Sequence, residues 1–312
     1  MPNIARVTAD VVIATWKARD LLERCLSALR ADPSEKTVIV VDNASGDGTI
    51  ELVREQFPEV KLVELPENVG FGRAINAGAR AGTGEAIVLV NDDAIVAPGF
   101  VDAIVAPFSD PVVGMVAGLM TIPDTDLVDG FGIELDRALA VYNRARRDPV
   151  GTRGGRLAMP SGGAAAYRRE AWESAGGFDE ALFAFGEDVD LGLRLRSLGW
   201  EAAEAPLARG VHLGGATTGV DSPFQREHAG IARGFLLRRY GILRSRAAPR
   251  ALLIDLLVVG WGLVRHRTVL PIRGRWRGWR AAGKRSRHAL PPDAVDPAIG
   301  VVESLRRLRT AR

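Results

Sequence analysis

The sequence predicts an α/β protein with a doubly wound, mostly parallel sheet and a basic helical extension at its carboxyl end. In the first 120 residues, short apolar runs alternate with stretches of helical periodicity, which is typical of right-handed crossovers between parallel strands. The run Ala86–Val90 is apolar at every position, as expected of a strand buried on both faces. The chain divides by charge into an acidic part, residues 1–224, and a basic part, residues 225–312. The acidic part holds 21 Lys/Arg and 33 Asp/Glu, whereas the basic part holds 20 Lys/Arg and 5 Asp/Glu.

The composition is that of a globular protein, with 25% charged and 47% hydrophobic residues in a chain of 312. Cys25 is the single cysteine, so a disulfide framework is excluded. No signal-peptide pattern opens the chain, and we therefore expect the cytosol as its compartment. No G-x-G-x-x-G follows the first strand and no G-x-x-x-x-G-K-[ST] occurs, which argues against a dinucleotide-binding fold and a P-loop ATPase.

The elements of the acidic part follow one another in order. Strands are predicted at Ala9–Thr15, Thr37–Val41, Val60–Leu65 and Glu85–Asp93, and helices over residues 20–29, from about residue 50, and over Ala74–Ala81. Parallel strands of such a sheet direct their carboxyl ends at one crevice, where open α/β folds bind ligands. Thr15, Asp42 and the adjacent pair Asp92 and Asp93 stand at these ends, so we expect them to share that crevice.

The residue types at the strand ends suggest a site for a metal and a nucleotide. Asp92 and Asp93 offer hard oxygen ligands that suit Mg²⁺ or Mn²⁺; the alternative is a solvated cap on a strand. Asp42 can accept a hydrogen bond from the ring N–H of uracil or thymine, and Arg73 can counter a phosphate. The alternative for the Asp42 loop is an ordinary connection between a strand and a helix.

The middle of the chain is less informative until residue 160. Val112–Met120 reads as a strand, and residues 121–150 as a long polar excursion over the active face. Gly162 and Gly163 then allow close approach of the backbone to a ligand, and Arg169–Ala175 reads as a short helix. A further helix opens at Gly186 with three carboxylates in its first turn, Glu187, Asp188 and Asp190. They can simply stabilise the helix, with Asp190 paired to Arg194, or one of them can accept a proton from a hydroxyl nucleophile.

The basic part is predicted to be helical. Phe224–Arg239 reads as a helix, residues 294–312 as a last short one, and the 14 apolar residues Ala251–Val264 are too short to cross a hydrocarbon core of ~30 Å. Three tryptophans lie among arginines, which fits an anchor on an anionic membrane surface. These residues are Trp261, Trp276 and Trp279, with Arg265, Arg267, Arg273, Arg275, Arg277 and Arg280. Nucleic acid is not expected as the partner because no recognised binding motif accompanies the charge; a protein-docking helix is the other alternative.

Seven segments carry a resemblance to a known family. They are VVIATWKARDLLERCLSAL, VDNASGDGT, NVGFGRAINAG, VLVNDDA, SGGAAAYRRE, GGFDEALFAFGEDVDLGLRLRSLGW and VHLGG. In this order and spacing they resemble the family 2 inverting glycosyltransferases of the GT-A fold, over roughly residues 10–219. The resemblance implies that residues 1–222 form a GT-A catalytic domain. Its nucleotide-sugar half would span about 1–120 and its acceptor half about 121–222, with residues 223–312 as the extension.

The resemblance also implies roles for individual residues. Asp188 is implied as the catalytic base, and Asp93 and His212 as metal ligands for Mg²⁺ or Mn²⁺. The nucleotide-sugar would be bound by Thr15, Asp42, Arg73, Asp92 and Asp93, and the acceptor side would include Gly162, Gly163, Glu187 and Trp200. Asn91 departs from the family's D-x-D motif by replacing its first aspartate.

The implied activity is single displacement of a sugar from a nucleotide-sugar, with inversion. The overall spacing is similar to bacterial rhamnosyltransferases that act on polyprenyl-diphosphate-linked sugars. This similarity suggests dTDP-rhamnose or a UDP-sugar as donor, a lipid-linked or cell-envelope glycan as acceptor, and a place on the inner face of the cell membrane. The alternatives are a catalytically idle membrane-associated scaffold and a sugar nucleotidyltransferase, although Ala9–Arg19 lacks the glycine-rich, basic loop of the latter.

Overall fold

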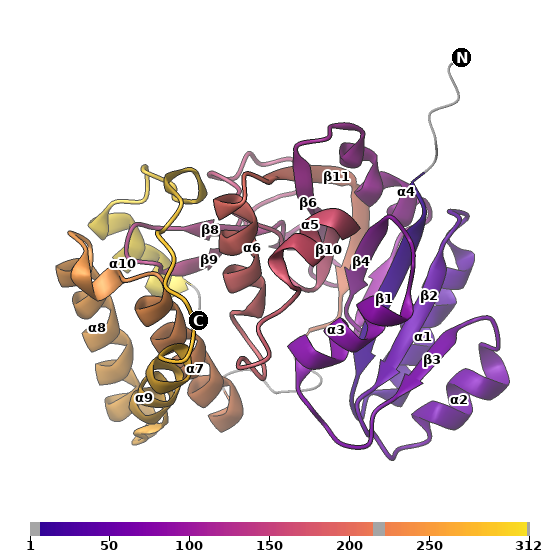
Figure 1. The fold of residues 1–312 in the computed structure, drawn as a ribbon, viewed down its shortest axis with the longest axis horizontal. Helices are drawn as coiled ribbons and strands as arrows, with labels where there is room; N and C mark the ends of the chain where they lie inside the picture. Colours follow the sequence, from indigo (N-terminus) through magenta and orange to yellow (C-terminus); the bar gives the residue numbers. More distant parts are fainter. Residues whose placement is uncertain (1–6, 215–221, 311–312) are drawn as a thin grey trace.

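The centre of the molecule is a nine-stranded sheet, seen in a computed structural model that describes residues 7–214 and 222–310. Its strands follow the order β3-β2-β1-β4-β10-β6-β11-β5, and β7 pairs with β6 (Figure 1). The strands are β1 Ala9–Thr15, β2 Thr37–Asp42, β3 Lys61–Glu64, β4 Ala86–Val90, β5 Ala94–Val96, β6 Val113–Thr121, β7 Val128–Gly130, β10 Ala164–Arg168 and β11 Glu201–His212. Strands β1 to β4 are mutually parallel, as predicted, whereas β10 runs antiparallel to β4 and β6.

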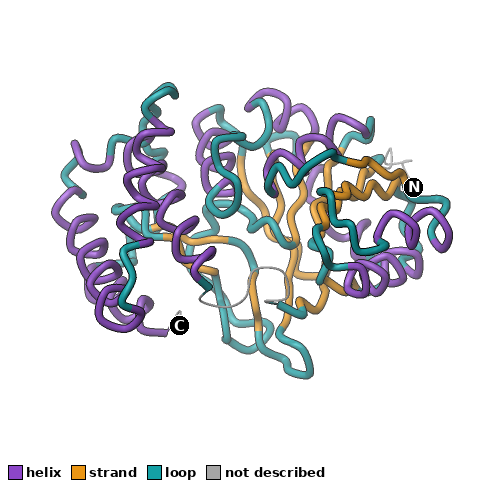
Figure 2. Tube along the Cα trace, turned by 90° about the horizontal axis from the view of Figure 1, so that it is seen from below, coloured by secondary structure: helices purple, strands orange, loops and turns teal. Residues whose placement is uncertain are grey.

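Helices cover both faces of this sheet (Figure 2), so the predicted doubly wound α/β fold is confirmed. They are α1 Arg19–Ala31, α2 Thr49–Gln56, α3 Phe71–Ala81, α4 Phe100–Val105 with the 3₁₀ turn Ala106–Ser109, α5 Arg169–Ala175 and α6 Glu187–Ser197. Alternate residues of a strand point to opposite faces. Ile13 therefore packs in the cluster that contains Leu26 of α1, while its neighbour Val12 packs in the cluster that contains Ile75 of α3.

The segment 121–150, predicted as a polar excursion, contains three short strands. Besides β7, these are β8 Ile133–Leu135 and β9 Val141–Asn143, which form a separate two-stranded sheet. Arg144 of this segment is buried and pairs with Glu204 at 2.7 Å. The pairing of β7 with β6 places this segment at the edge of the large sheet, next to the carboxyl end of β11.

The basic extension is helical, as predicted. It comprises α7 Pro223–Arg239, α8 Ala248–His266, α9 Leu270–Ala282 and α10 Val301–Thr310, with 3₁₀ turns at Ile242–Arg244 and Pro292–Ala294. In the described part of the chain, no helix is both long enough and apolar enough to span a bilayer. Residues 215–221, which precede the predicted domain boundary at 222, lie outside the described residues.

Helix α7 belongs to the same hydrophobic core as the sheet. Phe235 and Leu236 are buried in the cluster that also holds Ile75 and Leu193. The guanidinium of Arg239 on α7 pairs with Asp190 of α6 at 2.9 Å and with Asp179 at 3.0 Å. The core therefore continues across residue 222, and the domain boundary drawn there stays a prediction.

Helices α7 and α9 approach so closely that only glycine fits between them. Gly230 and Gly234 of α7 face Gly274 and Gly278 of α9, and a Cβ added at Gly278 would collide with the carbonyl oxygen of Ile231. Such glycine pairs four residues apart let two helix backbones pack against each other directly. This packing fixes α9, and with it the basic extension, on the body of the protein.

We expect Gly278→Ala to lower the free energy of unfolding by about 1–3 kcal/mol, because the added methyl group forces the two backbones apart. Gly260→Ala on α8 is the matched control. A Cβ there meets nothing within 4 Å, so alanine should stabilise the helix by roughly 0.5–1 kcal/mol. Urea unfolding followed by circular dichroism measures both. Equal stability of the two variants would contradict this close packing.

Candidate active site

The carboxyl ends of β1, β2 and β4 bring the predicted nucleotide residues to one edge of the sheet. Thr15 and Asp42 are register partners on β1 and β2, and the loop 91–93 follows β4, the other neighbour of β1. Asp42 is buried; its Oδ2 accepts a hydrogen bond from the Ser45 N–H at 3.2 Å, and its Oδ1 has no hydrogen-bond partner among the described residues. A buried acceptor without a donor is ready for a ligand N–H.

Asp92 and Asp93 place two buried carboxyl groups side by side after β4. Burial, together with the charge of Asp93, raises the pKa of Asp92 to about 7. A metal cation close to the loop would favour the ionised form of Asp92. The loop thus has the electrostatic character that a cation site requires.

His212, at the end of β11, connects Asp93 to a second carboxylate. Its Nε2 lies 3.1 Å from Asp93 Oδ1, and its Nδ1 lies 2.7 Å from Asp129 Oδ2. The hydrogen bond with Asp129 and then that with Asp93 raise the pKa of His212 to about 10. An imidazole held on one nitrogen by a carboxylate and free to bind metal with the other is a common arrangement at metal sites.

The His212 ion pairs should stabilise the metal-free protein in a pH-dependent way. The pKa of His212 rises from 6.5 to about 10 on folding, so the stabilisation is complete below about pH 6.5 and is lost as the pH rises through about 10. Urea unfolding of wild type and His212→Gln in the presence of a chelator measures it. The stability difference between them should shrink from neutral to alkaline pH; a constant difference would contradict the ion pairing.

Gly162 and Gly163 link the loop 91–93 to the head of α6. Because β10 pairs with β4, Gly163 lies beside Asn91, whose N–H donates to the Gly163 carbonyl at 3.3 Å. A Cβ on Gly163 would come 3.3 Å from the Asn91 side-chain nitrogen, so the glycine permits this approach. The N–H of Gly162 in turn donates to Asp188 Oδ2 at 3.3 Å.

Glu187 and Asp188 are adjacent acidic residues at the start of α6. Burial and the charge of Asp188 raise the pKa of Glu187 to about 8, and burial also raises the pKa of Asp188. Two backbone N–H groups, those of Val189 and Gly162, donate to Asp188, whereas Glu187 Oε2 has no partner among the described residues. Donors stabilise the ionised form, so Asp188 holds the negative charge of the pair and Glu187 the proton. Asp190 pairs with Arg194 at 2.8 Å, as predicted, and is part of the core.

Two predicted residues are placed elsewhere. Arg73 is half-exposed and lies 3.3 Å from Glu180, facing a surface depression that Arg280, Lys284 and Arg285 also line. Trp200 precedes β11, at the opposite end of this strand from His212, where it packs on Gly114 and donates to Ser174. The structure therefore brings neither residue to the strand-end carboxylates.

Asp129 is a site residue that sequence reasoning missed. It lies on β7, in the segment read as a polar excursion, and Arg146 and Arg147 are nearby. The hydrogen bond from His212 and these charges hold the pKa of Asp129 below its ordinary value, although burial opposes them. No motif marks this aspartate among the other acidic residues of the segment.

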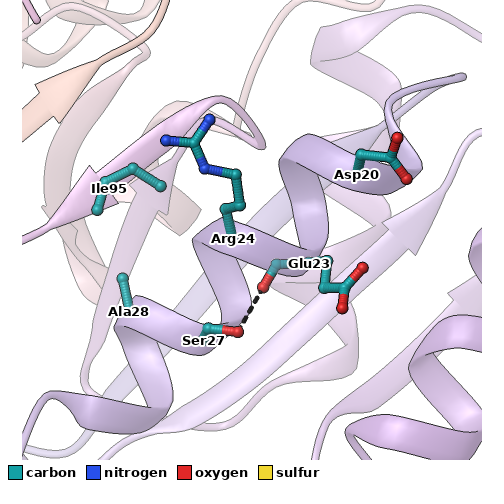
Figure 3. Close-up of a pocket in the computed structure, with 6 residues that line it drawn as sticks. All are labelled: Asp20, Glu23, Arg24, Ser27, Ala28 and Ile95. Atoms are coloured by element: carbon teal, nitrogen blue, oxygen red, sulfur yellow. Dashed lines mark hydrogen bonds between the residues drawn. The ribbon is translucent and has the colours of Figure 1, made fainter.

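Two surface hollows lie apart from the strand-end carboxylates. One of about 490 Å³ lies between α1 and β5 and is lined by Asp20, Glu23, Arg24, Ser27, Ala28 and Ile95 (Figure 3). Its polar side chains are those of the outer surface of α1, and Ser27 donates back to the Glu23 carbonyl of the same helix. Among the described residues, no cluster of three or more His, Cys, Asp or Glu side chains encloses a metal by itself. A cation held by Asp93 and His212 would thus need further oxygens from a diphosphate and water, which is how Mg²⁺ commonly binds.

The order and directions of the strands are those of the GT-A fold. The chain belongs to the family described as "Glycosyltransferase like family 2", whose pattern matches residues 6–230. It is an enzyme of the glycosyltransferase class, as the sequence predicted, and it resembles rhamnosyltransferases among them.

Among characterised relatives, the chain is similar to the N-acetylglucosaminyl-diphospho-decaprenol L-rhamnosyltransferase of Mycobacterium tuberculosis. The two are 31% identical over 252 residues, covering 68% of this chain and 78% of the relative. The O-antigen biosynthesis protein RfbC of Myxococcus xanthus is 30% identical over 228 residues, covering 68% of this chain and 18% of that protein.

Solved structures agree on the fold. The mannosyltransferase PcManGT from Pyrobaculum calidifontis, in complex with GDP-Man and Mn²⁺, superposes with a TM-score of 0.57 at 23% identity, over 90% of this chain and 74% of that one. GalNAc-T7 with UDP, GalNAc and Mn²⁺ superposes with a TM-score of 0.57 at 16% identity, over 85% of this chain and 58% of that one. Both structures contain Mn²⁺ and share the GT-A fold with this chain.

Proposed function

We propose that this glycosyltransferase moves a sugar, with inversion, from a metal-bound nucleotide-sugar to an acceptor hydroxyl, with Asp188 as the base. The observation that carries the proposal is the backbone link between the two acidic groups. Asn91 contacts Gly163, and Gly162 donates to Asp188, so the candidate base lies two short contacts from the loop that ends in Asp93. A base and a diphosphate site must lie on either side of one sugar for direct displacement.

The donor side is built from the strand ends. The unpartnered oxygen of Asp42 would accept from the N–H of a uracil or thymine ring, with Thr15 beside it on β1. Asp93 and His212 would hold Mg²⁺ or Mn²⁺, and Asp129 would orient the imidazole. The bound cation would neutralise the charge that develops on the leaving nucleoside diphosphate.

The acceptor side is built around the acidic pair. Asp188 would take the proton of the acceptor hydroxyl as its oxygen attacks the anomeric carbon and the bond to the diphosphate breaks. Glu187, holding its proton, would keep a second negative charge away from the nucleophile. A base with a raised pKa is a stronger proton acceptor than an ordinary aspartate, which suits a hydroxyl nucleophile.

For the substrates, dTDP-rhamnose or a UDP-sugar is proposed as donor and a polyprenyl-linked glycan of the cell envelope as acceptor. The similarity to the mycobacterial rhamnosyltransferase supports both. An acceptor of this kind lies at a membrane, so we also place the enzyme in the cytoplasm, peripherally on the inner face of the cell membrane. The basic extension, with its tryptophans, supports this location.

A thermal-shift screen of nucleotide-sugars and nucleoside diphosphates with and without Mn²⁺ or Mg²⁺ tests the donor site. The ligand that binds the native state most tightly should raise the melting temperature most at equal concentration, and only when metal is present. The selected donor is then incubated with the enzyme. Slow release of nucleoside diphosphate is expected; its complete absence, even with acceptor, would favour the idle scaffold, and release of diphosphate from a nucleoside triphosphate would favour the nucleotidyltransferase.

A further inference from the structure

Helix α8 exposes an unusually apolar surface. Ten of the seventeen large hydrophobic side chains that are exposed among the described residues lie between 252 and 276, on α8 and the first half of α9. On α8, Leu252, Leu256 and Val264 are 56%, 69% and 81% exposed, and Trp261 and Trp276 continue the surface. The exposed positions of α8 recur at spacings of four and seven residues, so they lie on one side of the helix.

The charge around this surface is mostly positive, although Glu227 of α7 pairs with Arg273 at 3.7 Å. Between Asp255 and Asp293 the chain has no acidic residue and nine Lys/Arg. Asp255 itself is turned inward, where Arg233 and Arg275 donate to it at 3.1 and 2.9 Å. The exposed side of α8 therefore presents leucines, valine and tryptophan, with the exposed Arg265 and Arg267 at its carboxyl end and Arg273 near the start of α9.

Not every arginine of this region is available to a partner. Arg275, predicted as one of the anchor cations, is instead part of the packing, because it binds Asp255 and burial lowers the pKa of its guanidinium. Arg277 pairs with Glu227 at 2.7 Å and stays half-exposed. The contact with Asp255 is what keeps the polar side of α8 against α7 and α9.

The helix is also held firmly on the catalytic body. At its start, Arg250 pairs with the buried Asp136 at 2.8 Å and donates to the Ile299 carbonyl. Figure 1 shows α8 at the opposite edge of the molecule from α2, with α7 between it and the sheet. An apolar face held in this way has a defined orientation relative to the active site.

We infer that the exposed side of α8, together with the start of α9, is a docking face that inserts into an anionic membrane surface. Apolar side chains and tryptophans supply the insertion, and the bordering arginines supply attraction to acidic lipid headgroups. A second copy of the chain is disfavoured as the occupant, because a symmetric contact would bring the same cations, Arg265 and Arg267 among them, close together. The inference deepens the proposed function by bringing the catalytic body to a lipid-bound acceptor, and it rests on that function only for the acceptor.

Cosedimentation of the full chain with vesicles tests the face. Phosphatidylglycerol–phosphatidylcholine vesicles should bind the protein, and pure phosphatidylcholine should bind it more weakly. The triple variant Leu252→Gln, Leu256→Gln, Val264→Gln should lose at least about tenfold in affinity, since each exposed side chain loses its transfer to hydrocarbon. The control variant Val112→Gln, Leu198→Gln, Leu207→Gln removes three side chains that are also exposed, at 46%, 55% and 76%, from the catalytic body and should bind as wild type does.

The charge contribution is tested separately. Arg265→Gln, Arg267→Gln, Arg273→Gln should weaken binding to the anionic vesicles and flatten its dependence on salt. The control Arg24→Gln, Arg54→Gln, Arg80→Gln removes the same charge from helices α1, α2 and α3, and should change neither. Unchanged melting temperature of each variant shows that it is folded.

Wild-type affinity of the α8 triple variant (Leu252→Gln, Leu256→Gln, Val264→Gln) would overturn the docking face. Equal binding of the wild type to neutral and anionic vesicles would overturn it as well. If the wild type is a dimer and the α8 triple variant is a monomer with unchanged vesicle binding, the face belongs to a contact with a second copy.

A failure of the proposed function can be distinguished from a failure of the docking face. Vesicle binding is measured without donor, and transfer to a short soluble acceptor is measured without membrane.

Discussion

Asp188→Asn should abolish sugar transfer while leaving donor binding nearly intact. The amide keeps the shape of the carboxylate but cannot accept a proton, and loss of a general base typically lowers a rate by about a hundredfold to ten-thousandfold. The Val189 N–H can still donate to the remaining oxygen, so the start of α6 should hold its place. Single-turnover transfer measures the rate, and titration of nucleoside diphosphate with Mn²⁺ measures donor affinity.

The matched control is Glu187→Gln, one residue away in the same acidic pair. If Glu187 carries the proton at neutral pH, as its raised pKa indicates, glutamine replaces a neutral group by a neutral group and should cost far less activity. Transfer at the wild-type rate by Asp188→Asn would remove it as the base. Equal, complete loss in both variants would show that the pair acts in some way other than the assigned one.

Asp93→Ala should lose metal-dependent donor binding. The alanine removes the carboxylate that His212 contacts at 3.1 Å, and with it a hard oxygen ligand for the cation that would neutralise the diphosphate beside Asp92 and Asp42. The apparent affinity for nucleoside diphosphate and Mn²⁺ should fall by more than the 10–100-fold that loss of an outer partner typically causes. Calorimetric titration with and without Mn²⁺ measures the two affinities.

Two further variants test how much His212 and Asp129 contribute to Mn²⁺-dependent binding beside Asp93. His212→Ala should weaken Mn²⁺-dependent binding less than Asp93→Ala, and Asp129→Asn should weaken it by about 10–100-fold, because the imidazole loses its orientation. Unchanged Mn²⁺-dependent affinity in Asp93→Ala would exclude the strand-end carboxylate from the metal site and, with it, the donor site proposed here.

The parts of the fold that the sequence predicted are those whose cause is local. A strand buried on both faces must be apolar at every position, so Ala86–Val90 was recognisable from its own residues. Parallel crossovers then require the ends of β1, β2 and β4 to meet, and this placed Thr15, Asp42, Asp92 and Asp93 at one edge before any tertiary contact was known. Asp188 and His212 were found by resemblance, because their neighbours match a family pattern.

Tertiary structure alone decided which side chains touch across long separations. Asp129 and His212 are 83 residues apart and meet only because β7 and β11 both pair with β6. Arg73 and Trp200 have side chains suited to the predicted roles, but neither lies at the strand-end carboxylates. Arg73 pairs with Glu180, and Trp200 lies at the opposite end of β11 from His212. Charge composition identified the basic extension, but only the packing of its helices showed that Arg275 donates to Asp255. Periodicity records whether a residue faces the core, whereas its partner depends on strand register and helix packing, which no local pattern contains.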